Sequence, residues 1–270
     1  MNLEEINAEL RTIERNHGCR ILFAAESGSR AWGFPSPDSD YDIRFFYAHP
    51  LNWYLQLDNQ KDTFQWFSGD LDFSGWDLRK ALRLFAACNP SMNEQLGSPI
   101  VYESNGVFSQ RIRELIPLYF NPVKAVHHYL GIAANFTEPV FRGEQVGIKK
   151  LFYILRPLLA GEWVAQFQTM PPTEFLRLLD ETSFDAELRK HIDDLLIQKE
   201  TAAEQSTIVV PPLIADWIRA TCERLPKECE RFPRQEKRGL EPLQQLFNEI
   251  GSCTIGDKPN LLMNTRATVR

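Results

Sequence analysis

Two aspartates, Asp40 and Asp42, are separated by one residue shortly after a glycine-serine turn in the sequence. In a β-strand such residues project from the same side, with Cα atoms about 6.5–7 Å apart. Two carboxylates this close repel each other unless a cation lies between them. Magnesium suits such a pair because proteins bind it through a few carboxylates together with substrate phosphates. The spacing therefore favours a divalent-metal site, and two such ions are typical of in-line phosphoryl chemistry.

Other interpretations of this acidic segment are a solvated turn, a calcium loop and a phosphate loop. The turn-forming residues 35–39 favour a turn there, and we expect Asp38 to belong to it. An EF-hand loop needs glycine at its sixth position and glutamate at its twelfth, where this chain has Ile43 and His49. The segment "GSRAWG" contains neither G-x-G-x-x-G nor a Gly-Lys-Ser/Thr ending. The calcium loop, the dinucleotide fingerprint and the Walker loop are therefore excluded.

The sequence around the aspartates predicts alternating helices and strands. Ile6, Leu10 and Ile13 recur at helical spacing, so residues 3–16 are expected to form an amphipathic helix that Gly18 ends. Strands are expected from residue 21, over 41–49, within 62–76 with a turn at 68–70, and over 98–104. Asp77 is well placed to cap the helix that follows it.

Beyond about residue 111 the patterns are almost entirely helical, and several segments begin with proline or an acidic residue. We therefore expect the α+β class: a catalytic domain over 1–110 with a mixed sheet and flanking helices, then an all-helical domain over 111–251. The polar residues 252–270 are expected to form a flexible tail.

Composition limits the classes of protein that fit. The chain has 270 residues, of which 43% are hydrophobic, and no apolar run approaches the ~20 residues that cross a bilayer. We expect a cytoplasmic protein with no membrane partner. Five cysteines without a CxxC pair indicate reduced thiols and no disulfide partner. The net charge of −6 argues against a broad nucleic-acid surface but leaves room for a local basic cleft holding a nucleotide or an RNA end.

Taken together, "GSRAWG" and "SDYDIR" resemble the nucleotidyltransferase signature of the DNA polymerase β superfamily, G-S-x-A-x-G followed by S-D-x-D. Further segments, "GWDLRKAL", "NPS", "SPIVY" and "LRPLLAGEW", resemble predicted bacterial nucleotidyltransferases, some of which are associated with RNA-repair operons. The resemblance covers residues 21–163 well. It implies that the N-terminal domain has a polymerase-β-like fold.

The resemblance also implies roles for particular residues. The turn at Gly28 and Ser29 would hold the triphosphate, with Arg30 adding positive charge, while Asp40 and Asp42 would bind metal. A third carboxylate is expected from a neighbouring strand. Asp72 is preferred because it lies in an alternating segment, whereas Asp77 has a structural role as a cap; Asp70 is a weaker option. The candidate catalytic and metal-binding residues are thus Asp40, Asp42 and Asp72.

Further candidates for contact with the nucleotide are basic and aromatic. Lys80, Lys149 and Lys150 are expected to contact phosphate. Lys149, Tyr153 and Arg156 follow helical spacing and share one face, which is expected either to line a cleft between the domains or to be solvated. The candidate nucleotide-binding residues are thus Gly28, Ser29, Arg30, Lys80, Lys149 and Tyr153.

The implied reaction is attack by a hydroxyl on the α-phosphate of a nucleoside triphosphate such as ATP, with release of pyrophosphate. Two Mg²⁺ or Mn²⁺ ions would support it. The acceptor is expected to be an RNA end in RNA repair, and a protein side chain or a small molecule stays open. Two other functions are considered: a protein adenylyltransferase-like enzyme and a catalytically idle nucleotide-binding regulatory module.

Overall fold

A five-stranded mixed sheet supports the N-terminal part of the chain, in the order β3-β4-β2-β1-β5. The computed structural model describes residues 3–36, 39–183, 185–201, 206–233, 235–236 and 238–253. Strands β2 and β4 are parallel, and the other neighbours are antiparallel. The strands are β1 (Arg20–Glu26), β2 (Tyr41–Ala48), β3 (Thr63–Ser68), β4 (Leu71–Asp77) and β5 (Val101–Ser104).

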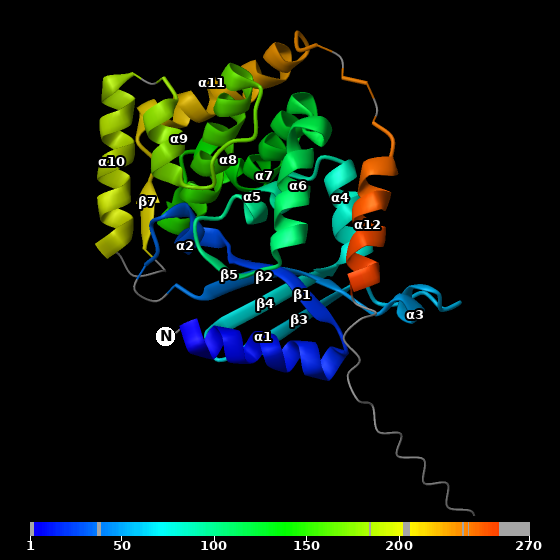
Figure 1. The fold of residues 1–270 in the computed structure, drawn as a ribbon. Helices are drawn as coiled ribbons and strands as arrows, with labels where there is room; N and C mark the ends of the chain where they lie inside the picture. Colours follow the sequence, from blue (N-terminus) through cyan, green and yellow to red (C-terminus); the bar gives the residue numbers. More distant parts are fainter. Residues whose placement is uncertain are drawn as a thin grey trace, which may run out of the picture.

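Helices cover both faces of this sheet (Figure 1). On one face, α1 (Leu3–His17) buries Ile6, Leu10 and Ile13, as their helical spacing predicts. The other face packs against helices that come from distant parts of the sequence. These are α4 (Leu78–Ala86), α5 (Pro90–Leu96), α6 (Gly106–Tyr119) and α12 (Glu241–Cys253).

A second, mainly helical core follows in the chain. Its buried residues include Phe34, which comes from the segment after the short helix α2 (Gly28–Trp32), so this core reaches the glycine-serine turn. A two-stranded sheet of β6 (Gln145–Gly147) and β7 (Thr207–Val209) adds to the helices that the sequence predicts. The helices are α7 (Pro122–Phe141), α8 (Ile148–Phe167), α9 (Phe175–Glu181), α10 (Ala186–Thr201) and α11 (Pro212–Cys229).

The predicted α+β class with a helical C-terminal part is confirmed. The division at residue 110 stays a prediction, and both α6 and α12, which lie beyond it, pack on the sheet. Helix α12 continues to Cys253, and the rest of the predicted tail lies outside the described residues. Among the described residues, no helix combines the length and apolar character that a bilayer-crossing segment needs.

The structure confirms two local predictions about β4. The β3–β4 hairpin turns at Gly69 and Asp70, between strands that end at Ser68 and begin at Leu71. At its other end Asp77 caps α4, because its Oδ1 accepts a hydrogen bond of 2.8 Å from the backbone N–H of Arg79. These two features fix where β4 begins and ends.

Candidate active site

Asp42 and Asp72 are direct neighbours across the parallel strands β2 and β4. Neighbouring strands are about 4.8 Å apart, and paired residues project from the same face of a sheet. Two carboxylates from different parts of the chain therefore meet near the N-terminal ends of β2 and β4. Their side chains are 31% and 27% exposed, so both are partly removed from water.

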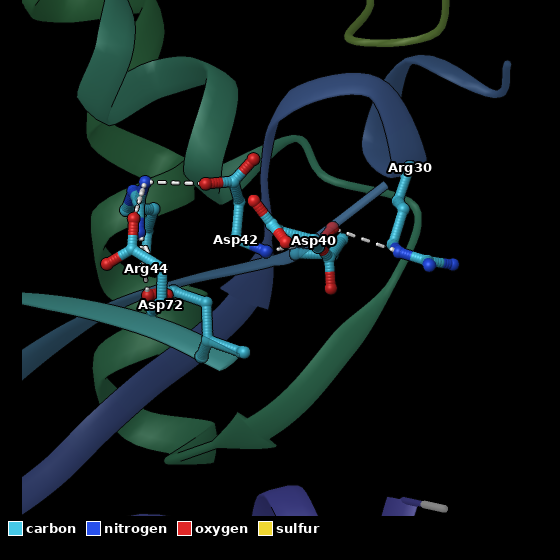
Figure 2. A network of polar contacts seen from close by, with 7 residues as sticks. Arg30, Asp40, Asp42, Arg44 and Asp72 are labelled. Carbon is cyan, nitrogen blue, oxygen red and sulfur yellow. Dashed lines mark hydrogen bonds and ion pairs between the residues drawn. The ribbon is translucent and has the colours of Figure 1, made fainter. Parts of the chain in front are cut away.

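Arg44 bridges these two acids (Figure 2). Its Nη2 lies 2.8 Å from Asp42 Oδ1 and 3.0 Å from Asp72 Oδ2, and its Nη1 donates to the backbone oxygen of Asp72 at 3.0 Å. The other carboxylate oxygen of Asp72, Oδ1, is buried and has no hydrogen-bond partner within the described part of the chain. Sequence reasoning missed Arg44. Its position two residues after Asp42, on the same side of β2, is the signal that identifies it.

The glycine-serine turn packs directly against Asp42. Gly28 has φ +61°, and a Cβ atom there would lie 2.4 Å from Asp42 Oδ2. Any other residue at this position would meet two costs, the left-handed backbone and the approach of the Asp42 carboxylate. The backbone N–H of Ser27 donates to the Asp42 carbonyl at 2.8 Å, which fixes the turn to the start of β2. Ser29 lies in the first turn of α2, with its hydroxyl 3.3 Å from that of Ser39.

Glu26 holds the backbone of Asp42 from the neighbouring strand. Its carboxylate accepts a hydrogen bond of 2.8 Å from the Asp42 N–H and another from the Tyr102 hydroxyl of β5. Glu26 is only 1% exposed, and this burial raises the pKa of its carboxyl group, although the bond from Tyr102 opposes the rise. Neither residue was predicted from the sequence, where Glu26 ends an apolar run.

Asp40 is an exposed residue directly before β2, and Arg30 fixes the backbone around it (Figure 2). The Arg30 guanidinium donates to the carbonyl of Ser39 at 2.7 Å and to that of Asp40 at 3.1 Å. It also lies 3.7 Å above the ring of Tyr41. The Arg30 guanidinium, which was predicted to contact phosphate, thus holds the backbone of Ser39 and Asp40 before β2. Asp38, predicted to be a turn residue, lies outside the described residues.

The electrostatics of Asp42 reflect several charges that converge on it. Burial raises the pKa of its carboxyl group; Arg44 lowers it, Asp72 and Asp40 raise it, and Lys149 lowers it. Lys149 stands in the first turn of α8, so positive charge from the helical core acts on this acid. The charges of Asp40 and Asp72 therefore both act on Asp42 at one end of the sheet.

The donor set fits a hard divalent cation. Asp42 and Asp72 offer carboxylate oxygens, which Mg²⁺ and Mn²⁺ prefer, and the unpartnered Oδ1 of Asp72 adds a buried acceptor. Within the described ranges, no cluster of three or more His, Cys, Asp or Glu side chains is grouped for metal binding. The fit consequently rests on the Asp42–Asp72 pair, with the exposed Asp40 next to it.

Lys80 and Asp77 lie away from this pair, at the other end of β4. Asp77 lies five positions after Asp72 along the strand, a distance of about 17 Å. Lys80 forms an ion pair of 3.0 Å with Asp62. Asp77 is 1% exposed and also accepts a hydrogen bond of 2.7 Å from the Tyr54 hydroxyl. Its surroundings match the structural role as a helix cap.

The predicted face of α8 packs against the N-terminal part of the protein. Tyr153 meets the ring of Trp32 edge-on, with the ring centroids 5.2 Å apart. Arg156 is 2% exposed and forms an ion pair with Glu94 of α5. The alternative that this face is solvated is therefore wrong at Arg156, because its guanidinium is buried in this ion pair.

A family model and a known protein each match most of the length of this chain. A family model described as "RlaP: RNA repair pathway DNA polymerase beta family" matches residues 3–249. The chain is also similar to the "Uncharacterized protein YcgL" of Bacillus subtilis (strain 168). The two are 37% identical over 245 residues, which cover 90% of this chain and 94% of the relative.

Proposed function

This chain belongs to the RNA repair pathway DNA polymerase beta family, and from that premise we propose that it is a metal-dependent nucleotidyltransferase. It would transfer a nucleoside monophosphate from a nucleoside triphosphate to a hydroxyl group and release pyrophosphate. The observation that carries the proposal is the pairing of Asp42 with Asp72, beside a turn where a Cβ atom on Gly28 would lie 2.4 Å from Asp42 Oδ2.

Asp42 and Asp72, with Asp40 next to them, would hold the Mg²⁺ or Mn²⁺ ions. When bound, such ions lower the pKa of an attacking hydroxyl and neutralise charge on the triphosphate. Glu26 and Ser27 would position Asp42 through its backbone N–H and carbonyl. Pre-set positions of this kind reduce the reorganisation that the reaction requires.

The phosphates would contact the Gly28–Ser29 turn and Lys149. The effect of Lys149 on the pKa of Asp42 supports its inclusion, because this lysine lies within electrostatic range of the acid. Tyr153 would support the turn through Trp32 of α2. Lys80 is left out of the proposal because its ion pair with Asp62 lies at the opposite end of β4.

We further propose that the acceptor hydroxyl belongs to an RNA end. The family description supports an RNA substrate, and the net charge of −6 favours a short contact over a long nucleic-acid footprint. ATP is the first triphosphate to test.

The test is transfer of label from the four α-labelled nucleoside triphosphates, with Mg²⁺ or Mn²⁺, to an RNA pool. We expect Asp42→Asn and Asp72→Asn each to reduce transfer by about 100-fold or more. Residues that only orient a metal ligand contribute about 10- to 100-fold, and loss of a ligand itself should cost at least as much. The matched control is Asp62→Asn, which also removes one acid but at the far end of β4. Transfer by Asp42→Asn at the rate of the control would show that the site is assigned wrongly. Label on the protein itself, without label on RNA, would indicate that the acceptor is a protein side chain and not an RNA end.

A further inference from the structure

Arg44 occupies the position between the two acids that the proposed function needs for metal. Its Nη2 contacts the carboxylates of both Asp42 and Asp72, and its Nη1 donates a hydrogen bond to the backbone carbonyl of Asp72. Its side chain is 22% exposed, so water screens these contacts only partly. A residue of the same sheet thus neutralises part of the charge of the two carboxylates and reduces their repulsion.

A guanidinium and a divalent ion compete for these oxygens. Guanidinium has five N–H donors, no acceptor atom, and a charge that it keeps at every ordinary pH, so it can neither ligate a metal nor become neutral beside one. A second positive centre placed on Asp42 Oδ1 and Asp72 Oδ2 would therefore meet a fixed like charge at close range. A divalent ion that takes both of these oxygens therefore displaces the guanidinium from them.

We propose that Arg44 is a built-in competitor of the metal: divalent ions bind the Asp42–Asp72 pair only when its guanidinium is displaced. This inference rests on the proposed function. It has a consequence for the order of binding. A free divalent ion must displace Arg44 unaided, whereas a metal–triphosphate complex also brings phosphate oxygens that can pair with a displaced guanidinium. Arg44 thus couples metal binding to nucleotide binding, and the coupling acts equally in both directions.

The experiment measures Mn²⁺ binding by electron paramagnetic resonance, with and without a non-hydrolysable ATP analogue. We expect Arg44→Gln to bind Mn²⁺ alone roughly tenfold more tightly than the parent, a change of about 1.4 kcal/mol. The analogue should strengthen Mn²⁺ binding in the parent by a larger factor than in Arg44→Gln. Arg113→Gln is the matched control, since Arg113 donates to the carbonyls of Leu96 and Ser109. We expect its Mn²⁺ affinity to equal that of the parent.

The outcomes separate this inference from the proposed function. Equal or weaker Mn²⁺ binding by Arg44→Gln, with clear binding by the parent, overturns the competitor role and leaves the metal site intact. Absence of Mn²⁺ binding from the parent and from every variant overturns both. If Arg44→Gln does not fold, Arg44→Lys replaces it. Lysine keeps the charge but loses the fork, so a smaller gain in Mn²⁺ affinity is expected, and no gain contradicts the inference.

Discussion

Replacing Gly28 by alanine places a methyl group in the space that the carboxylate of Asp42 occupies. Two separate costs follow. The first is the backbone: Gly28 has φ +61°, and an L-residue in the left-handed region costs about 1–2 kcal/mol. The second is the clash, since the added Cβ would lie 2.4 Å from Asp42 Oδ2 whereas a close carbon–oxygen contact is about 3.3 Å. The carboxylate must therefore withdraw by about 1 Å.

That withdrawal has a further price for the site. Asp42 Oδ1 is held by Arg44 at 2.8 Å, and a displaced carboxylate gives up this ion pair, which is worth about 1 kcal/mol at a partly exposed position. The expected loss in the free energy of unfolding is about 2–3 kcal/mol. We expect the rate of nucleotide transfer to fall by up to about 100-fold, because a displacement of about 1 Å at reacting groups can have an effect of this size.

Gly69→Ala is the control that separates the two costs. Gly69, in the β3–β4 turn, has φ +58°, and a Cβ atom there meets nothing within 4 Å. Urea unfolding should show the backbone cost in both variants, while Mn²⁺ binding and label transfer should fall in Gly28→Ala alone. If Gly28→Ala binds Mn²⁺ and transfers label as well as Gly69→Ala does, the contact between the turn and Asp42 has no functional role.

Two further predictions concern buried charges. Arg156→Met leaves Glu94 without its partner and should lower the free energy of unfolding, measured by urea titration, by about 3–5 kcal/mol. The double variant Arg156→Met/Glu94→Gln should recover most of this loss. A double variant as unstable as the sum of the two single variants would refute the pairing. Because burial raises the pKa of Glu26 above its ordinary value of 4.5, the folded protein binds that proton more tightly than the unfolded chain. The stabilising effect of protonated Glu26 is present below pH 4.5 and is lost as the pH rises through the folded pKa. The difference in the free energy of unfolding between Glu26→Gln and the parent should therefore change across this pH range. A constant difference would contradict the raised pKa of Glu26.

Local patterns were sufficient for many parts of the fold. The spacing of Ile6, Leu10 and Ile13 predicted the buried face of α1, because a helix returns to the same side every three to four residues. The β3–β4 turn and the capping role of Asp77 followed from residue types that satisfy backbone geometry within a few positions. Each of these features is decided by neighbours in the chain.

The site depends on contacts that no local pattern encodes. Asp42 meets Asp72 because β2 and β4 pair in parallel although they are not consecutive strands, and the sequence leaves that register open. In the sequence, Glu26 is only the last residue of an apolar run. Its role depends on Tyr102 of distant β5, whose hydroxyl donates to its carboxylate. Likewise, helical spacing placed Arg156 on a face of α8, but the burial of its guanidinium depends on a distant partner, Glu94 of α5.

Asp42 is restrained from every side of its backbone and side chain. Glu26 accepts from its N–H, Ser27 donates to its carbonyl, Arg44 holds one carboxylate oxygen, and Gly28 leaves room for the other. Stability alone does not explain this arrangement, because burial raises the pKa of the acid and so opposes its charged form. A neutral residue of the same size would avoid that cost. A carboxylate held charged, and held in place, is useful where it must present an oxygen at a defined point, which is what binding a metal ion requires.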